Sequence, residues 1–259
     1  MPFVSTTSAK VHYEIDGTGP ALAMVHGVGG DAEKVFGPIV DSFAEHHTVI
    51  RPNLSGSGDT TDDGRQLTVE DLAEQVAAAI IDADAGPADL VGFSLGAVVA
   101  AAVAAEHPRL VRRLVLIGGW AHTTGPRDKF YFETWQRMLD ADREVFKRFA
   151  TLTGFSPAAL DRFGHEGLAA SLADAWPPEG IARQIDVAGR VDIRPLLPGI
   201  TAETLVIALG LDHMVPPQGS RQLHEAIAES RLVELPHDGH MDWFAGPERI
   251  VHHISSFID

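Results

Sequence analysis

The chain has 259 residues, of which 45% are hydrophobic and 22% charged, a balance typical of a globular protein with a sizeable core. Its formal net charge of −16 argues against nucleic acid and anionic membrane surfaces as partners, because both need clustered Lys and Arg. It has no cysteine, signal-peptide pattern or membrane-length apolar run, so we expect a cytoplasmic protein without disulfides, thiolate chemistry or a membrane anchor.

Strands and helices alternate along most of the chain. Residues 21–25 form a continuous apolar run, typical of a strand buried on both faces, and Thr68 opens a helix with one apolar face. This alternation predicts an α/β fold with a mostly parallel central sheet and helices on both faces. The expected strands are residues 3–6, 11–15, 21–25, 48–51, 90–93, 111–117, 204–209 and 231–235, and the expected helices are residues 32–44, 67–84, 97–105, 218–228 and 247–258.

Residues 120–198 interrupt this alternation. The segment has a helical pattern, no convincing buried strand and many aromatic residues. An insertion of this length after a sheet strand is more typical of a structured cap than of a loop. We therefore predict a core made of residues 1–119 and 199–259, with a helical cap made of residues 120–198.

The segment Gly92-Phe93-Ser94-Leu95-Gly96 joins a predicted strand to a predicted helix. A Gly-x-Ser-x-Gly corner holds its serine on a tight, strained turn, and the two glycines let the strand and the helix approach each other. The hydroxyl of Ser94 then stands clear of the sheet, at the positive end of the helix. A simple Gly-Ser helix cap is the alternative explanation for this pattern.

Two later strands end close to residues that a serine nucleophile requires. Asp212 follows the strand at 204–209, and His240 follows the strand at 231–235. Because the carboxyl ends of parallel strands share one edge of a sheet, we expect Ser94, Asp212 and His240 to gather there. A serine hydroxyl becomes a good nucleophile only when a base takes its proton, and that base must itself be oriented.

With these residues in the order Ser, Asp, His, the chain resembles the α/β-hydrolase fold superfamily over nearly its whole length. The resemblance implies that Ser94 is the nucleophile, that His240 is the general base and then acid, and that Asp212 orients the histidine. The chain looks like a single-domain member with a helical cap, similar to enol-lactone hydrolases and carboxylesterase-like proteins, and the match is weakest in residues 120–198. The variable cap of the family corresponds to residues 120–198.

The pair His26-Gly27 resembles the family's oxyanion motif. The resemblance implies that the backbone N–H groups of Val28 and Leu95 form the oxyanion hole. One departure is visible at residues 53–58, which read Asn-Leu-Ser-Gly-Ser-Gly where many members carry an Asp followed by Gly-His-Gly. We interpret this change as a sign of altered substrate choice.

Neighbouring residues offer alternative interpretations of the site. Asp238 is a rival orienting carboxylate, but its position two residues before His240 gives poor geometry for holding the imidazole. His237 is a second candidate base. The residues His237, Asp238, His240 and Asp242 could suggest a metal site, but a clear ligand from elsewhere in the chain is missing, so we predict no metal.

The glycine-rich corner at residues 27–32 also fits G-x-G-x-x-A, the fingerprint of a dinucleotide site after a strand. However, it follows an earlier pair of strands, and the next strand ends in Arg51, where a dinucleotide site needs an acidic residue. We therefore expect no cofactor. Reduction dependent on a nicotinamide stays the weakest of the functions considered.

Taken together, these features predict a serine hydrolase acting on a small, rather apolar ester or lactone. We expect His26, Trp120, Phe130 and Trp135 to contact this small-molecule substrate. One alternative is a tailoring enzyme of secondary metabolism that uses the same fold for cyclisation, elimination or carbon–carbon bond chemistry. Another is a non-catalytic ligand-binding protein on a hydrolase scaffold. The sequence leaves monomer and homodimer open.

Overall fold

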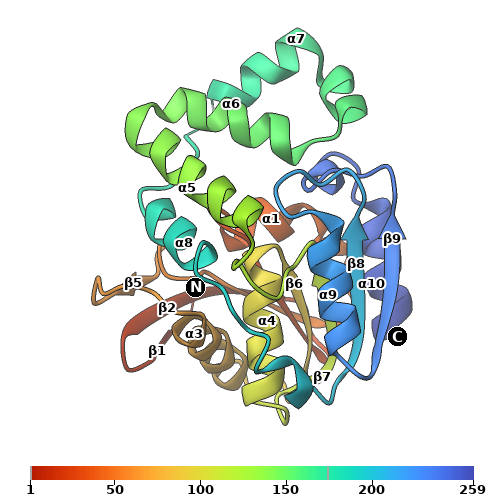
Figure 1. Cartoon of the computed structure of the whole chain (residues 1–259). Helices are drawn as coiled ribbons and strands as arrows, with labels where there is room; N and C mark the ends of the chain where they lie inside the picture. The colour runs from red at the N-terminus through yellow and green to blue at the C-terminus, as the bar shows by residue number, and fades with distance from the viewer. Residues whose placement is uncertain (1, 174) are drawn as a thin grey trace.

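A central sheet, with helices on both faces, positions everything else in the molecule (Figure 1). The computed structural model describes residues 2–173 and 175–259, and in these residues the strand order is β1-β2-β4-β3-β6-β7-β8-β9, with β5 paired to β2. Neighbours from β4 to β9 are parallel, whereas β1, β2 and β5 pair antiparallel. The strands are β1 (Phe3–Ser5), β2 (Ala9–Asp16), β3 (Ala21–Val25), β4 (Thr48–Pro52), β5 (Thr61–Asp62), β6 (Ala88–Phe93), β7 (Val111–Ile117), β8 (Glu203–Leu209) and β9 (Ser230–Leu235).

The helices divide into two layers on the sheet and a separate group. In β6, Leu90 packs in the core shared with α3 and α4, whereas Val91 and Phe93 pack in the core shared with α1 and α10. This alternation confirms the predicted α/β fold with two covered faces. The α-helices are α1 (Ala32–Phe36), α2 (Asp41–Ala44), α3 (Val69–Asp82), α4 (Leu95–Glu106), α5 (Pro126–Ala141), α6 (Arg143–Gly154), α7 (Pro157–Ala173), α8 (Ile181–Ala188), α9 (Pro217–Ala226) and α10 (Glu248–Ile258).

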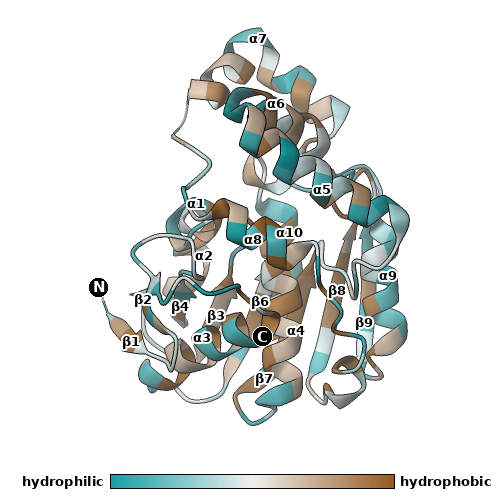
Figure 2. Cartoon of the chain, turned by 60° about the vertical axis from the view of Figure 1, so that its left-hand side comes forward, coloured by the Kyte–Doolittle hydropathy of each residue, from teal (hydrophilic) through white to brown (hydrophobic). Residues whose placement is uncertain are grey.

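Hydropathy follows this layering. Figure 2 shows hydrophobic residues concentrated on the central strands and α4, with mixed residues on α5, α6 and α7. All five residues of β3 are buried, as expected of a strand covered on both faces. Residues 95–104 of α4 are likewise all buried, because the helix lies between the sheet and other elements. None of the helices that the structure describes is long and apolar enough to cross a membrane.

Four helices, α5 to α8, lie between β7 and β8 and stand above the carboxyl ends of the strands (Figure 1). An isolated bridge between His122 and Asp192 joins the two ends of this segment. Inside it, α5 packs against α6 and α8. We propose that residues 120–198 work as a cap over the core formed by residues 1–119 and 199–259.

Two local details differ from the sequence-based expectation. The helix predicted at residues 32–44 is broken into α1, a short 3₁₀ turn (Gly37–Ile39) and α2, because Pro38 lacks the N–H that would continue α1. The two-residue strand β5 was missed because it is too short to show a period. The predicted helix start at Thr68 is confirmed, since its side chain accepts from the N–H of Asp71.

Candidate active site

Ser94 lies at the corner between β6 and α4 in a conformation that few residues adopt. Its φ is +57° and its ψ is −123°, and its N–H donates to the carbonyl oxygen of Ile117 at 2.9 Å. Only glycine fits on either side: a Cβ on Gly92 would lie 2.3 Å from the carbonyl oxygen of Gly96, and a Cβ on Gly96 would lie 2.0 Å from that of Val25. The corner is therefore the strained turn that the sequence pattern predicts.

Asp212 and His240 form a buried pair beyond the ends of β8 and β9. Nδ1 of His240 lies 2.5 Å from Oδ2 of Asp212. The other carboxylate oxygen, Oδ1, accepts from the N–H groups of Met214 at 2.8 Å and Val215 at 2.7 Å. These contacts fix the carboxylate and hold the imidazole by Nδ1, which leaves Nε2 free for proton transfer.

Ser94 and His240 line one cavity of about 120 Å³. Within residues 2–173 and 175–259, no hydrogen bond joins the Ser94 hydroxyl to the imidazole. Such bonds are often long in a free enzyme and shorten in its substrate complex. The structure thus brings Ser94, His240 and Asp212 to one edge of the sheet, with Asp212 bonded to the imidazole.

Among the backbone N–H groups near Ser94, those of Val28, Leu95 and Gly96 have no partner in the described part of the chain. Leu95 is the first residue of α4, where an α-helix leaves its N–H groups unpaired. Val28 follows Gly27, which lies so close to Ser94 that a Cβ on it would be 2.8 Å from the Cβ of Ser94. Unpaired backbone donors close to a serine are available for a hydrogen bond to an oxyanion.

Apolar side chains enclose most of the cavity. Trp120 and Trp135, both predicted from the sequence, line it. Phe130 does not, and its side chain is 72% exposed, which corrects the prediction that it contacts substrate. The reason is helical phase: the buried face of α5 begins at Tyr131, so the side chain one residue earlier points to solvent.

His26 also stays outside the cavity, which corrects the second prediction of a substrate contact. Its fully buried ring links two loops: Nε2 accepts from the N–H of Leu54 at 3.0 Å, and Nδ1 donates to the carbonyl oxygen of Gly27 at 2.8 Å. Burial lowers the pKa of His26, so the ring is neutral with its proton on Nδ1. His26 therefore shapes the loop that carries Val28.

Several lining residues were missed by sequence reasoning. Met214 and Met241 follow Asp212 and His240 within two residues, so the strand-end argument that found the pair applies to them as well. The aromatic residues of the cap that line the cavity could not be identified from the sequence, because tertiary packing determines which of the many rings face inward. The other lining side chains include Lys34, Val35, Phe93, Tyr131, Phe132, Trp176, Val215 and Phe244.

The rival residues have other positions. Oδ1 of Asp238 accepts from the guanidinium of Arg249 at 2.6 Å, so this carboxylate is engaged away from the imidazole. His237 is exposed. Among residues 2–173 and 175–259, the structure gathers no group of three or more His, Cys, Asp or Glu side chains that could hold a metal ion.

Comparisons with known proteins agree with this fold. A model of the alpha/beta hydrolase fold family matches residues 20–247. The chain is 40% identical over 261 residues to pyrrolizixenacetamide deacetylase of Xenorhabdus hominickii, in an alignment covering 100% of this chain and 98% of that protein. It is 29% identical over 246 residues to a pimeloyl-[acyl-carrier protein] methyl ester esterase of Neisseria meningitidis serogroup C, covering 91% and 92%.

Among solved structures, the enol-lactonase from Burkholderia xenovorans LB400 superimposes with a TM-score of 0.85, at 24% identity, over 99% of both chains. This match supports the fold alone. The family match spans most of the chain. The two relatives named above are hydrolases by name, and their alignments with this chain cover nearly their full lengths. The chain therefore belongs to the α/β-hydrolase fold family and is an enzyme of the hydrolase type.

Proposed function

We propose that this enzyme is a serine hydrolase that cleaves small carboxylic esters, lactones or amides with a short acyl group. The observation that carries the proposal is that His240, held by the buried carboxylate of Asp212 at 2.5 Å, lines the same cavity as Ser94. A buried carboxylate that holds Nδ1 keeps the imidazole oriented to accept a proton at Nε2. The unpaired N–H groups of Val28 and Leu95 support the same chemistry.

In the proposed reaction, Nε2 of His240 takes the proton of Ser94 while Oγ bonds to the substrate carbonyl carbon. The carbonyl oxygen becomes an oxyanion that accepts hydrogen bonds from Val28 and Leu95. The bond to the leaving oxygen or nitrogen then breaks, and the imidazolium donates its proton to that atom. Water, deprotonated by the same imidazole, attacks the acyl-serine ester and releases the carboxylic acid and free Ser94.

The size and lining of the cavity favour a substrate with a short acyl group. Its volume of about 120 Å³ is below the ~150 Å³ of an apolar cavity that holds a benzene ring. Its walls are mostly aromatic and aliphatic side chains, which favour an uncharged group. The relative that is 40% identical is named a deacetylase, which favours acetyl over longer acyl groups and adds amides to the esters and lactones expected from the sequence.

The test compares the wild-type enzyme with Ser94→Ala on p-nitrophenyl esters of two to eight acyl carbons, a lactone and an N-acetyl amide. We expect the wild type to prefer the acetyl ester over the octanoyl ester by about 100-fold in kcat/KM, because a long chain displaces packed rings. Ser94→Ala should lose at least about 10⁴-fold in kcat while its melting temperature is retained. Wild-type activity in Ser94→Ala would contradict the proposal.

A fluorophosphonate probe separates the remaining possibilities. Labelling of Ser94 together with turnover of short esters or amides supports the proposed hydrolase. Labelling without turnover of any substrate would favour a tailoring reaction on an activated serine, and absence of both would favour a ligand-binding protein.

A further inference from the structure

Gln184 of α8 lies between two loops at the catalytic edge. We call residues 27–30, after β3, the oxyanion loop, and residues 53–58, after β4, the serine loop. The Gln184 side chain is fully buried, and its Oε1 accepts from the N–H of Gly29 at 2.7 Å. Its Nε2 donates to the carbonyl oxygen of Ser55 at 3.0 Å and to Oγ of Ser57 at 2.9 Å. One cap side chain thus bonds to both loops.

Glycines let the cap approach this closely. A Cβ on Gly180, at the start of α8, would lie 2.3 Å from the Cα of Gly56 in the serine loop. A Cβ on Gly29 would lie 2.7 Å from Cδ1 of Ile181. The carbonyl oxygen of Gly29 accepts from the indole N–H of Trp176 at 2.8 Å. Both backbone polar groups of Gly29, the residue next to Val28, are therefore bonded to side chains of the cap.

The serine loop is the part of the chain that departs from the common family pattern, and the structure shows what its serines do. Oγ of Ser57 accepts from Gln184 and donates to the carbonyl oxygen of Gly30 at 2.5 Å. Its short hydroxyl fills the space between the two loops and α8. Within residues 53–58, Ser57 is thus a bridge from Gln184 of the cap to Gly30 of the oxyanion loop.

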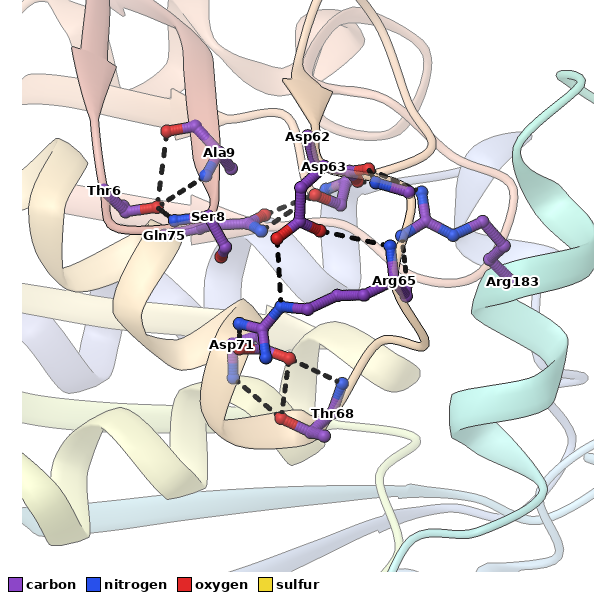
Figure 3. A network of polar contacts seen from close by, with 12 residues as sticks. Thr6, Ser8, Ala9, Asp62, Asp63, Arg65, Thr68, Asp71, Gln75 and Arg183 are labelled. Atoms are coloured by element: carbon purple, nitrogen blue, oxygen red, sulfur yellow. Dashed lines mark hydrogen bonds and ion pairs between the residues drawn. The ribbon is translucent and has the colours of Figure 1, made fainter.

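A second buried glutamine holds the serine loop from the other side. Oε1 of Gln75, in α3, accepts from the N–H of Ser55 at 2.9 Å, and its Nε2 donates to Oγ of Ser55 at 2.8 Å. The same polar network joins Asp62 to Arg183 of α8, the neighbour of Gln184 (Figure 3). Gln75 has no hydrogen bond to the oxyanion loop in the part of the chain described, so it is a matched control for Gln184.

We propose that Gln184 is a positioning residue: from its place in the cap, its side chain holds the oxyanion loop in position. The oxyanion hole is then complete only when the cap is packed against the core. The proposal rests on the proposed function, because it gives the N–H of Val28 the role of oxyanion donor. Holding the N–H of Gly29 fixes the peptide that follows Val28, and catalytic geometry tolerates errors of only about 0.5 Å. Loss of a single oxyanion donor costs about 10²–10³-fold in kcat.

The experiment compares full-length wild type, Gln184→Met and Gln75→Met, since methionine fills a similar volume without amide hydrogen bonds. Amide hydrogen exchange is measured on peptides covering residues 27–30, together with kcat and KM for p-nitrophenyl acetate. For Gln184→Met we expect faster exchange at residues 27–30 and a kcat lower by about 10–100-fold. KM and the pH profile of kcat/KM should stay unchanged, because the pair of Asp212 and His240 is untouched.

Gln75→Met should leave exchange at residues 27–30 as in the wild type and keep kcat within about threefold, whatever its effect on melting temperature. Wild-type exchange and kcat in Gln184→Met would overturn the proposal, as would an equal loss of kcat in both variants. Gln184→Glu keeps an acceptor for the N–H of Gly29, so its exchange at residues 27–30 should stay slower than that of Gln184→Met.

If Gln184→Met does not fold, Gly180→Ala replaces it. Its added Cβ must lift the start of α8 from Gly56, and the same rise in exchange is expected; unchanged exchange would again overturn the proposal. Failure of the proposed function would show separately, as a wild-type enzyme without ester or amide turnover and without labelling of Ser94. The exchange measurements decide the role of Gln184 in that case too.

Discussion

The sheet edge that carries Ser94, Asp212 and His240 and the proposed cap meet at one cavity but position their residues by different means. At the edge, short hydrogen bonds and glycine contacts fix each group: Asp212 accepts from three N–H groups, and Gly96 lets α4 press against β3. In the cap, packing between aromatic rings fixes the positions of the side chains; Trp120, for example, stacks on Phe132 with the ring centroids 5.7 Å apart. We therefore infer that the edge determines the reaction and that the cap determines the shape of its substrate.

The largest effect expected from breaking the edge is that of Asp212→Asn. The amide can present its N–H₂ to Nδ1 of His240, which favours the wrong tautomer, so kcat should fall by about 10⁴-fold with little change in fold. The matched control is Asp238→Asn, because Asp238 pairs with Arg249 and not with the imidazole. Steady-state kinetics and thermal melts would check both. Comparable losses of kcat in the two variants would mean that the carboxylate was misassigned.

A smaller effect is expected from the cap, and it should change selectivity more than rate. Phe132→Ala removes a ring that lines the cavity, so the preference for acetyl over octanoyl esters should drop by about tenfold. Phe130→Ala is the control two positions away on the same helix, and its exposed ring should leave the preference unaltered. Competition between the two esters measures the ratio directly. If both variants shifted it equally, the cavity would not be the acyl site.

The smallest effect concerns stability and His26. The unfolded chain binds a proton at this histidine near its ordinary pKa of 6.5, whereas burial lowers the pKa in the folded protein. At a pH between the lowered pKa of the folded protein and 6.5, the unfolded state binds more protons than the folded state. The contribution of His26 to the free energy of unfolding is therefore complete above about pH 6.5 and falls as the pH drops below that value. His26→Gln should flatten this decline by up to about 1.4 kcal/mol per pH unit. Urea unfolding at pH 5 and pH 7.5 would measure it, and an unchanged slope would show that other groups cause the decline.

Much of the catalytic edge could be predicted because it depends on local patterns. Gly92, Ser94 and Gly96 require one backbone geometry, and the apolar strands before Asp212 and His240 send both residues to the same edge. The inward rings of the cap could not be predicted, since helical phase places Phe132 inside and Phe130 outside. Gln184 left no sequence signal, because its partners are backbone groups and serines more than 120 residues away along the chain.

The most direct test of the account is the site of covalent reaction. After treatment with a fluorophosphonate, peptide mapping by mass spectrometry should find a single adduct on Ser94 in the wild type, and His240→Ala should slow its formation by at least about 10³-fold. An adduct on another residue, or labelling of Ser94 at the same rate without the imidazole, would contradict an oxygen activated by His240 at this edge.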